Sequence, residues 1–242
     1  MKVLFNLILK VVDFFYKKKI IFFFKNNLKD NLNILIDVGA HKGETIQEFL
    51  SNFNIKNIYS FEASSKTFEE LQAETEKLKK KFALTNIEIF NFGVGSSNKK
   101  NIFYELEDSN SSTFNIIDRN SSYYKKKNRI LSFFFLKNKS DIKKTEISQI
   151  KLSEFINKKN IYHIDILKID TEGYELEVLK GLEHEISNIK FIYFEHHYDN
   201  MIKKNYKYSD IHDYLKVKGF QKVFKIKMPL RKSFDYIYKK TI

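Results

Sequence analysis

From residue 33 onward, short apolar runs alternate with segments whose apolar residues recur every three or four positions. The runs have the length of strands, and the segments have the period of helices that bury one face. Helical spacing is clear at Ile46, Phe49, Leu50 and Phe53. The pattern predicts seven strands: Ile34–Val38, Ile58–Glu62, Ile87–Phe92, Ile164–Ile169, Phe191–Glu195, Phe220–Ile226 and Phe234–Tyr238.

Alternating strands and helices predict an α/β fold, in which crossover helices cover both faces of a mostly parallel sheet. The last two predicted strands have no helix between them. We therefore expect them to form an antiparallel pair at the edge of the sheet.

Residues 1–30 form a different kind of segment, which we expect to precede a domain over residues 31–242. Polar residues of Met1–Lys19 fall on one narrow stripe of a helix, and apolar residues fill the rest: the stripe is Lys2, Asn6, Lys10, Asp13 and Lys17. The longest uncharged run, Val3–Leu9, is far shorter than a bilayer span of roughly 20 residues. No small-residue cleavage site follows it, so we do not expect a secretory signal. Packing on the domain, a second subunit and a membrane surface remain as partners for this amphipathic helix.

Residues 108–144 interrupt the alternation with a serine-rich stretch, a lysine cluster and the aromatic sequence LSFFFL. An insertion of this length in a small domain is usually a lid, a binding loop or disorder. We interpret it as a surface insertion that acts as a lid, because its aromatic residues otherwise have nothing to cover them.

Composition narrows the chemistry. There is no cysteine, which excludes disulfides, thiol nucleophiles and cysteine-based metal sites. The formal net charge is +13, but only three of the 43 basic residues are arginine. Because arginine is the usual reader of bases, this composition argues against sequence-specific nucleic-acid binding.

The sequence ILIDVGAHKGETI places Asp37, Gly39 and Gly43 where the first strand passes into a helix. Glycines there let the backbone approach a ligand closely, at the sheet edge where doubly wound folds bind nucleotides. The spacing is neither the G-x-G-x-x-G of dinucleotide binders nor a P-loop. A tight turn without a ligand is the structural alternative.

Glu62 ends the second predicted strand, 23 residues after Gly39. This is close to the interval of about 20 residues at which an acid meets a ribose diol in Rossmann-type folds. A surface glutamate that opens a helix is the competing interpretation.

Two later strands also end in acidic or histidine residues that could take part in catalysis. Asp170 follows the strand in LKIDTEGYELEVLKGL, with Glu172 in the turn after it, and we expect both near the substrate. In FIYFEHHYD, strand alternation puts Glu195 and His197 on one face. Because no H-x₃-H spacing exists, we expect these two residues to handle a proton or a hydrogen bond rather than a metal.

Taken together, DVGAHKG, FEA, LKIDTEGYELEVLKG and FEHH resemble the FkbM family of S-adenosylmethionine-dependent methyltransferases over roughly residues 33–226. The resemblance implies a seven-stranded, Rossmann-like class I methyltransferase fold. By this resemblance the donor is bound by Asp37, Gly39, His41, Gly43 and Glu62, with His41 where asparagine is more common. It also implies that Asp170 and Glu172 lie near the acceptor.

The implied reaction is O-methylation of a hydroxyl on a sugar, polysaccharide or glycolipid, which needs a positioned base. We expect a cytoplasmic enzyme, with peripheral membrane contact or oligomer formation through residues 1–30 as further alternatives. Three rival functions are a nicotinamide-dependent oxidoreductase, a nucleic-acid methyltransferase and a non-catalytic membrane scaffold. Nucleic-acid enzymes that methylate amino groups usually carry a Pro-Pro-aromatic motif, and the only proline here is Pro229.

Overall fold

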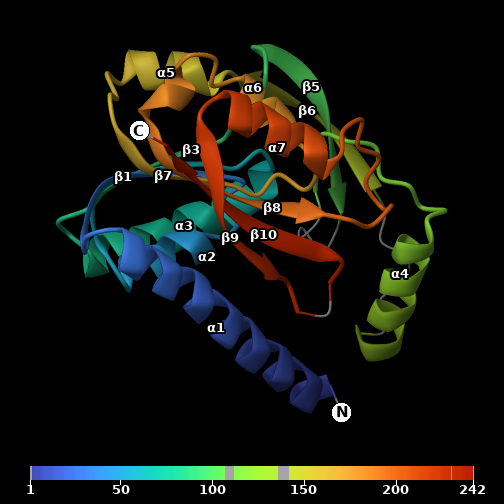
Figure 1. Ribbon diagram of the computed structural model, residues 1–242. Helices are drawn as coiled ribbons and strands as arrows, with labels where there is room; N and C mark the ends of the chain where they lie inside the picture. Colours follow the sequence, from blue (N-terminus) through green and yellow to red (C-terminus); the bar gives the residue numbers. More distant parts are fainter. Residues whose placement is uncertain (1, 107–111, 136–141, 230, 242) are drawn as a thin grey trace.

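A seven-stranded sheet in the order β3-β2-β1-β7-β8-β10-β9 forms the centre of the computed structural model (Figure 1). The five strands from β3 to β8 are parallel, and β10 is antiparallel to both of its neighbours. The strands are β1 Asn31–Val38, β2 Asn54–Phe61, β3 Asn86–Phe90, β7 Ile164–Ile169, β8 Ile189–His197, β9 Phe220–Lys227 and β10 Ser233–Lys240. The structure describes residues 2–106, 112–135, 142–229 and 231–241.

All seven predicted strands are present, and the predicted antiparallel pair is the β9–β10 hairpin at the edge. The hydrophobic pattern is clearest where a strand is buried on both faces. Every residue of β7 is buried, and four consecutive residues end both β1 and β2 in the interior. Strands covered on both faces appear in the sequence as continuous apolar runs.

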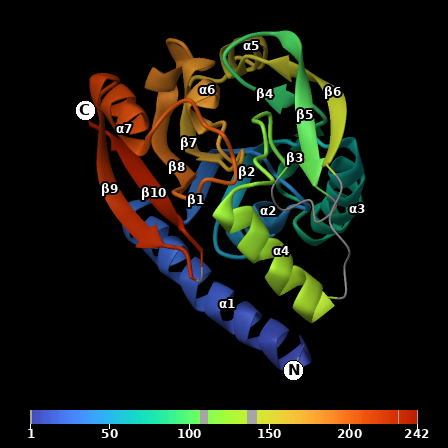
Figure 2. The same ribbon diagram turned by 90° about the vertical axis from the view of Figure 1, so that its right-hand side faces the viewer.

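Helices cover the two faces of the sheet and bury separate cores (Figure 2). Leu35 and Ile36 are neighbours in β1 but belong to different cores, as strand alternation requires. One face is covered by α1 Lys2–Asn27, α2 Glu44–Leu50 and α3 Ser65–Lys81. The other face is covered by α5 Leu152–Lys158, α6 Glu175–Lys180, the short 3₁₀ helix Glu185–Asn188 and α7 Tyr208–Val217.

Helix α1 continues well beyond the residues in which its polar stripe is clear. Its second half packs on the sheet through Tyr16, Ile20 and Phe24, and Phe24 is completely buried. The ring of Phe24 lies 5.5 Å from that of Phe49 and 5.8 Å from that of Phe191, between ring centroids. No helix in the described ranges is both long and apolar enough to cross a membrane.

A second, three-stranded sheet lies beside the first, and the sequence pattern missed it. Its order is β4-β6-β5, with β4 Gly93–Val94, β5 Lys99–Leu106 and β6 Ile142–Ile150. Most positions of β5 and β6 are exposed or half-buried, so neither strand has an apolar run. The predicted insertion 108–144 lies mainly between these two strands and includes a helix that periodicity did not reveal, α4 Ser122–Phe135.

Replacing Phe24 by alanine should destabilise the protein by about 3–5 kcal/mol, because a completely buried aromatic ring is removed from the core. Phe22 lies two positions away in α1 with 66% of its surface exposed, and Phe22→Ala should change stability by no more than about 0.5 kcal/mol. Urea unfolding of both variants measures the difference. Equal, small effects would show that α1 is not part of the core.

Candidate active site

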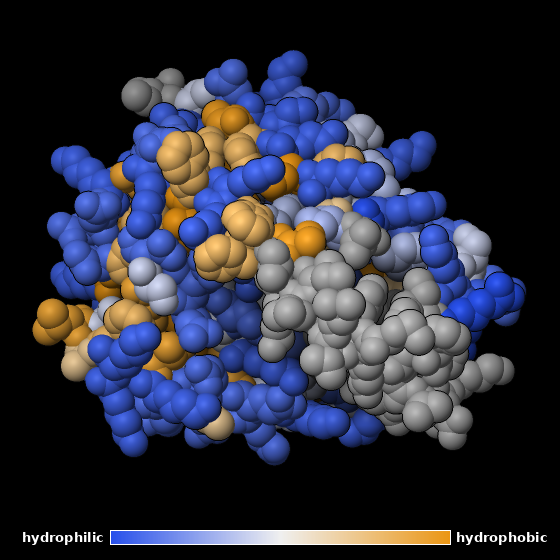
Figure 3. Space-filling view, turned by 90° about the horizontal axis from the view of Figure 1, so that it is seen from below, coloured by the Kyte–Doolittle hydropathy of each residue, from blue (hydrophilic) through white to orange (hydrophobic). Residues whose placement is uncertain are grey.

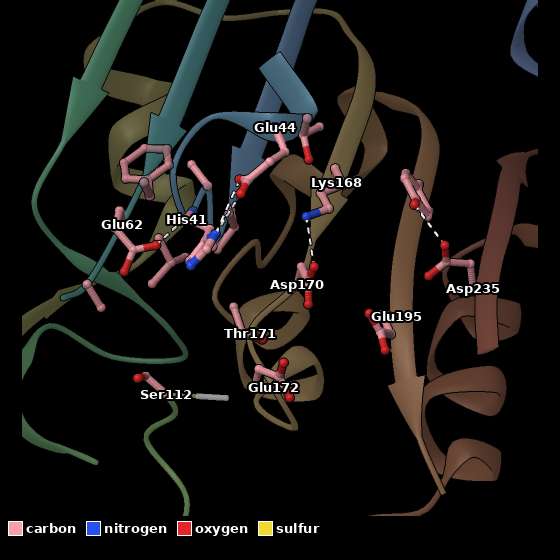
Figure 4. Close-up of a pocket in the computed structure, with 18 of the residues that line it drawn as sticks. His41, Glu44, Glu62, Ser112, Lys168, Asp170, Thr171, Glu172, Glu195 and Asp235 are labelled. Atoms are coloured by element: carbon pink, nitrogen blue, oxygen red, sulfur yellow. Dashed lines mark hydrogen bonds and ion pairs between the residues drawn. The ribbon is translucent and has the colours of Figure 1, made fainter. Parts of the chain in front are cut away.

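A cavity of about 400 Å³ opens at the carboxyl ends of β1, β2, β7 and β8 (Figure 4). Of the predicted site residues, six line it: Gly39, His41, Glu62, Asp170, Glu172 and Glu195. Three others, Asp37, Gly43 and His197, lie behind this lining. Parallel strands end at the same edge of a sheet, which is why residues up to 156 positions apart meet here.

The turn after β1 depends on glycine at its closest approach to β7. A Cβ atom on Gly39 would overlap the main-chain carbonyl oxygen of Asp170, and the φ of Gly39 is +81°. Gly43 has φ +91° and precedes α2. His41 lies between them at φ +49°, with its Nδ1 3.0 Å from Oε1 of Glu44. Gly39 thus brings this turn against the end of β7 at the cavity wall.

The carboxylate of Glu62 joins two loops at the end of β2. One oxygen accepts a hydrogen bond from the amide of His41 at 2.9 Å, and the other accepts one from the amide of Ser64 at 2.9 Å. Burial raises the pKa of Glu62 to about 7, against the effect of these two amides. A carboxylate has about four acceptor sites, so two remain for hydroxyl groups in the cavity.

Lys168 is a site residue that the sequence analysis missed. Its Nζ lies 3.1 Å from Oδ2 of Asp170 and 3.6 Å from Oδ1 of Asp37. Burial alone would lower the pKa of Lys168, but the two carboxylates outweigh it and raise the pKa. Burial would raise the pKa of Asp170, yet the Lys168 ammonium lowers it, whereas burial raises the pKa of Asp37 to about 6. A lysine inside the apolar run of β7 was the signal available for this ion pair.

His197 connects the carboxylates of two predicted residues. Its Nε2 lies 3.1 Å from Oε2 of Glu172 and 3.2 Å from Oε1 of Glu195, so the predicted pairing of Glu195 with His197 on one face is present. Burial would lower the pKa of His197, but the surrounding carboxylates raise it to about 10. Burial also raises the pKa of Glu195. The imidazolium therefore holds both glutamates at the cavity wall.

The far side of the cavity comes from the two ends of the chain, where the sequence contains no motif. Asp235 of β10 accepts hydrogen bonds from Tyr16 of α1 at 2.6 Å and from Tyr193 of β8 at 2.9 Å. Burial raises the pKa of Asp235 to about 7. Arg231 and Lys17 add positive charge to the same side. Within the described ranges, no group of three or more His, Asp or Glu side chains is arranged to hold a metal ion.

A family model described as the methyltransferase FkbM domain matches residues 37–222, which is more than half of the chain. The chain belongs to the FkbM methyltransferase family. The match confirms the resemblance seen in the sequence and decides between a methyltransferase and a nicotinamide-dependent oxidoreductase. S-adenosylmethionine is the cofactor of this FkbM domain, as the resemblance implied.

Solved structures agree on the fold. An FkbM methyltransferase from Methylobacillus flagellatus has a TM-score of 0.57 and 15% identity; the alignment covers 87% of this chain and 45% of that protein. This FkbM domain therefore spans less than half the length of that protein. The magnesium protoporphyrin IX methyltransferase of Synechocystis, solved with bound S-adenosylmethionine, has a TM-score of 0.51 and 10% identity, with 96% and 81% covered. Among curated proteins, none matches the sequence.

These likenesses confirm the predicted Rossmann-like class I methyltransferase fold with its mostly parallel seven-stranded sheet. They do not test the roles of individual residues in the FkbM domain. The donor-binding and catalytic assignments made from the sequence therefore stay predictions, now with a geometry attached to each residue.

The His197 cluster predicts a specific pH dependence of stability. Between its ordinary pKa of 6.5 and about 10, the folded protein holds a proton that the unfolded chain has lost. Its stabilising contribution is thus complete below pH 6.5 and declines as the pH rises to about 10. His197→Gln should cost about 2–4 kcal/mol at pH 6, and this cost should shrink towards pH 10.

Urea unfolding of the parent protein and of His197→Gln at several pH values measures this difference. Other titrating groups are present in both proteins and largely cancel from it. A cost that is independent of pH would contradict a charged His197 in the folded state.

Proposed function

We propose that this protein transfers a methyl group from S-adenosylmethionine to a hydroxyl group of a sugar, polysaccharide or glycolipid. The observation that supports the proposal best is the division of one cavity. Gly39, His41 and Glu62 line it on the β1–β2 side, whereas Glu172 and Glu195 line it on the β7–β8 side. A donor and an acceptor can therefore meet inside it.

The β1–β2 side has the chemistry that the donor needs. The remaining acceptor sites of Glu62 suit a ribose diol, and Gly39 and His41 line the cavity beside it. Phe92, Phe103 and Val94 line the neighbouring wall, and such side chains suit the faces of an adenine ring. The residues present thus fit the adenosyl part of the donor.

When bound, S-adenosylmethionine supplies a methyl group on a positively charged sulfur. The protein must then orient a hydroxyl group and take its proton as the methyl carbon exchanges its bond to sulfur for a bond to the hydroxyl oxygen. We assign the proton to the carboxylate of Glu195, because burial raises its pKa towards the range in which a base works best. Asp170 is the weaker base, since Lys168 lowers its pKa, and it is better suited to orient the hydroxyl.

The residues around the acceptor favour a polyhydroxylated molecule. Three carboxylates line this part of the cavity: Asp13 of α1, Glu172 of the turn after β7 and Glu195 of β8. Carboxylates accept hydrogen bonds from paired hydroxyls. They also outnumber the two cations on this side, Lys17 and Arg231, so this part of the cavity disfavours the phosphates of a nucleic-acid backbone. A small-molecule or glycan acceptor therefore suits the site better than RNA or DNA does, in spite of the net charge of +13.

Glu62→Gln should weaken the binding of S-adenosylhomocysteine at least about tenfold, because a hydrogen bond to a charged group contributes about 1.5–3 kcal/mol. At 100 times its dissociation constant, this ligand stabilises the parent protein by about 2.7 kcal/mol, a thermal shift of roughly 5–11 °C. The exposed Glu76→Gln in α3 is the matched control and should keep the full shift. An undiminished shift in Glu62→Gln would refute its role in donor binding.

Glu195→Gln should lower kcat for methyl transfer by about 10²–10⁴, the usual contribution of a general base. Its thermal shift with S-adenosylhomocysteine should remain, because Glu195 lies away from Glu62 (Figure 4). The assay follows labelled methyl groups into free sugars, glycans, glycolipids and RNA. Transfer to RNA alone would overturn the acceptor class, and unaltered kcat in Glu195→Gln would overturn the assigned base.

A further inference from the structure

The outward face of α1 combines aromatic side chains with lysines. Phe14, Phe15 and Phe22 have 53%, 59% and 66% of their surface exposed. Lys18 and Lys25 are also exposed, and at 100° per residue they fall on the same face as the three phenylalanines. We call this set of five residues the outer face of α1. Figure 3 shows apolar and hydrophilic side chains mixed on this side of the molecule.

Other positions in the same helical turns line the cavity. Asp13, Tyr16 and Lys17 contribute to the cavity wall, and the hydroxyl of Tyr16 donates to Asp235 of β10 at 2.6 Å. Helix α1 is thus fixed to the sheet at the acceptor side of the site. A helix with its side chains is about 10–12 Å wide, so the outer face and the cavity wall are separated by no more than this distance.

We propose that α1 docks this protein on the surface of an anionic lipid bilayer and presents the cavity to hydroxyl groups at the level of the lipid headgroups. The acceptor would then be the sugar of a glycolipid headgroup or of a lipid-linked glycan. The docking surface stands on the geometry of α1 alone, whereas the acceptor rests on the proposed methyltransferase function.

Charge selects a bilayer over a second copy of the chain. In a symmetric dimer, the outer face of one subunit would meet the same face of the other, so that lysines would face lysines. Like charges in contact are unfavourable. An anionic membrane supplies the opposite charge, and each lysine near such a surface adds about 1 kcal/mol of attraction. The net charge of +13 acts in the same direction.

The depth to which interfacial helices insert also favours a bilayer as the partner of α1. Interfacial helices bury their apolar face about 5–10 Å into the boundary between headgroups and acyl chains. Insertion of the outer face to that depth leaves the cavity-lining residues of α1, Asp13 and Lys17, at the level of the headgroups. An acceptor hydroxyl would reach the cavity without leaving the membrane surface.

The absence of tryptophan from the sequence allows a direct test on the full chain. Phe15→Trp places a single fluorophore on the outer face, and Leu84→Trp places one at a position that is 99% exposed and distant in sequence from α1. Vesicles of phosphatidylcholine mixed with phosphatidylglycerol should shift the Phe15→Trp emission to the blue, and brominated acyl chains should quench it. The Leu84→Trp emission should not change. Equal responses of the two variants, or none, would overturn the proposal.

A second pair of variants measures affinity. The triple variant Phe14→Ser, Phe15→Ser, Phe22→Ser should bind these vesicles at least about tenfold more weakly in co-sedimentation, because three apolar contacts are lost. Leu84→Ser, Tyr162→Ser, Val217→Ser removes three exposed apolar side chains elsewhere and should bind like the parent protein. Equal binding to pure phosphatidylcholine, or a dimer in sedimentation velocity that only the first triple variant loses, would overturn the proposal.

Donor binding separates this inference from the proposed function. The first triple variant should keep its thermal shift with S-adenosylhomocysteine, which shows that its fold and donor site are intact. A parent protein that binds vesicles but shows no such shift would refute the methyltransferase function and leave the docking surface standing. A parent protein that shows the thermal shift but does not bind vesicles would refute the docking surface and leave the methyltransferase function standing.

Discussion

The ammonium group of Lys168 holds the centre of this structure together. It lies on β7, the middle strand of the seven-stranded sheet, directly beside Asp37 of β1 in the register, and it also meets Asp170 at the end of its own strand. Removing one partner from a buried ion pair typically costs about 3–5 kcal/mol, because the remaining charge stays out of water. The two strands that carry the site are therefore tied by charge as well as by backbone hydrogen bonds.

The turns on both sides follow from this pairing. The amide of Asp170 donates to the carbonyl of Val38 at 2.8 Å, which draws the two strand ends so close that only glycine fits at position 39. After Asp170, the carboxylate of Glu175 accepts from the amide of Gly173 at 2.8 Å and from the hydroxyl of Tyr206. The motif around Asp170 thus combines residues that contact the cavity with residues that shape the turn behind it.

The sequence predicted most clearly the strands that are buried on both faces, such as β7. Strand β9 has only one buried position and was recognised from its apolar residues Val223, Phe224 and Ile226. The seven strands of the main sheet were identifiable, and so were the residues at their carboxyl ends, such as Glu62 and Glu195. Strands β5 and β6 were missed because charged and amide residues make up about half of each, and most of their positions are exposed or half-buried. Tyr16 and Asp235 were missed for another reason: they are 219 positions apart, and only the folded sheet brings them together.

The parts of the cavity that were predicted and the parts that were missed are also built from different elements. One side of the cavity is built from turns within the parallel sheet, where Asp170 meets both Lys168 and Gly39, and Glu62 accepts a hydrogen bond from His41. Another side includes α1 and β10, which meet through the hydrogen bond between Tyr16 and Asp235. Changes in α1 can therefore reshape that second side while the turns of the parallel sheet keep their contacts. Under the proposed function, an acceptor bound beside α1 meets an element that does not hold the donor, so that one methyl-transfer site can be adapted to different hydroxyl groups.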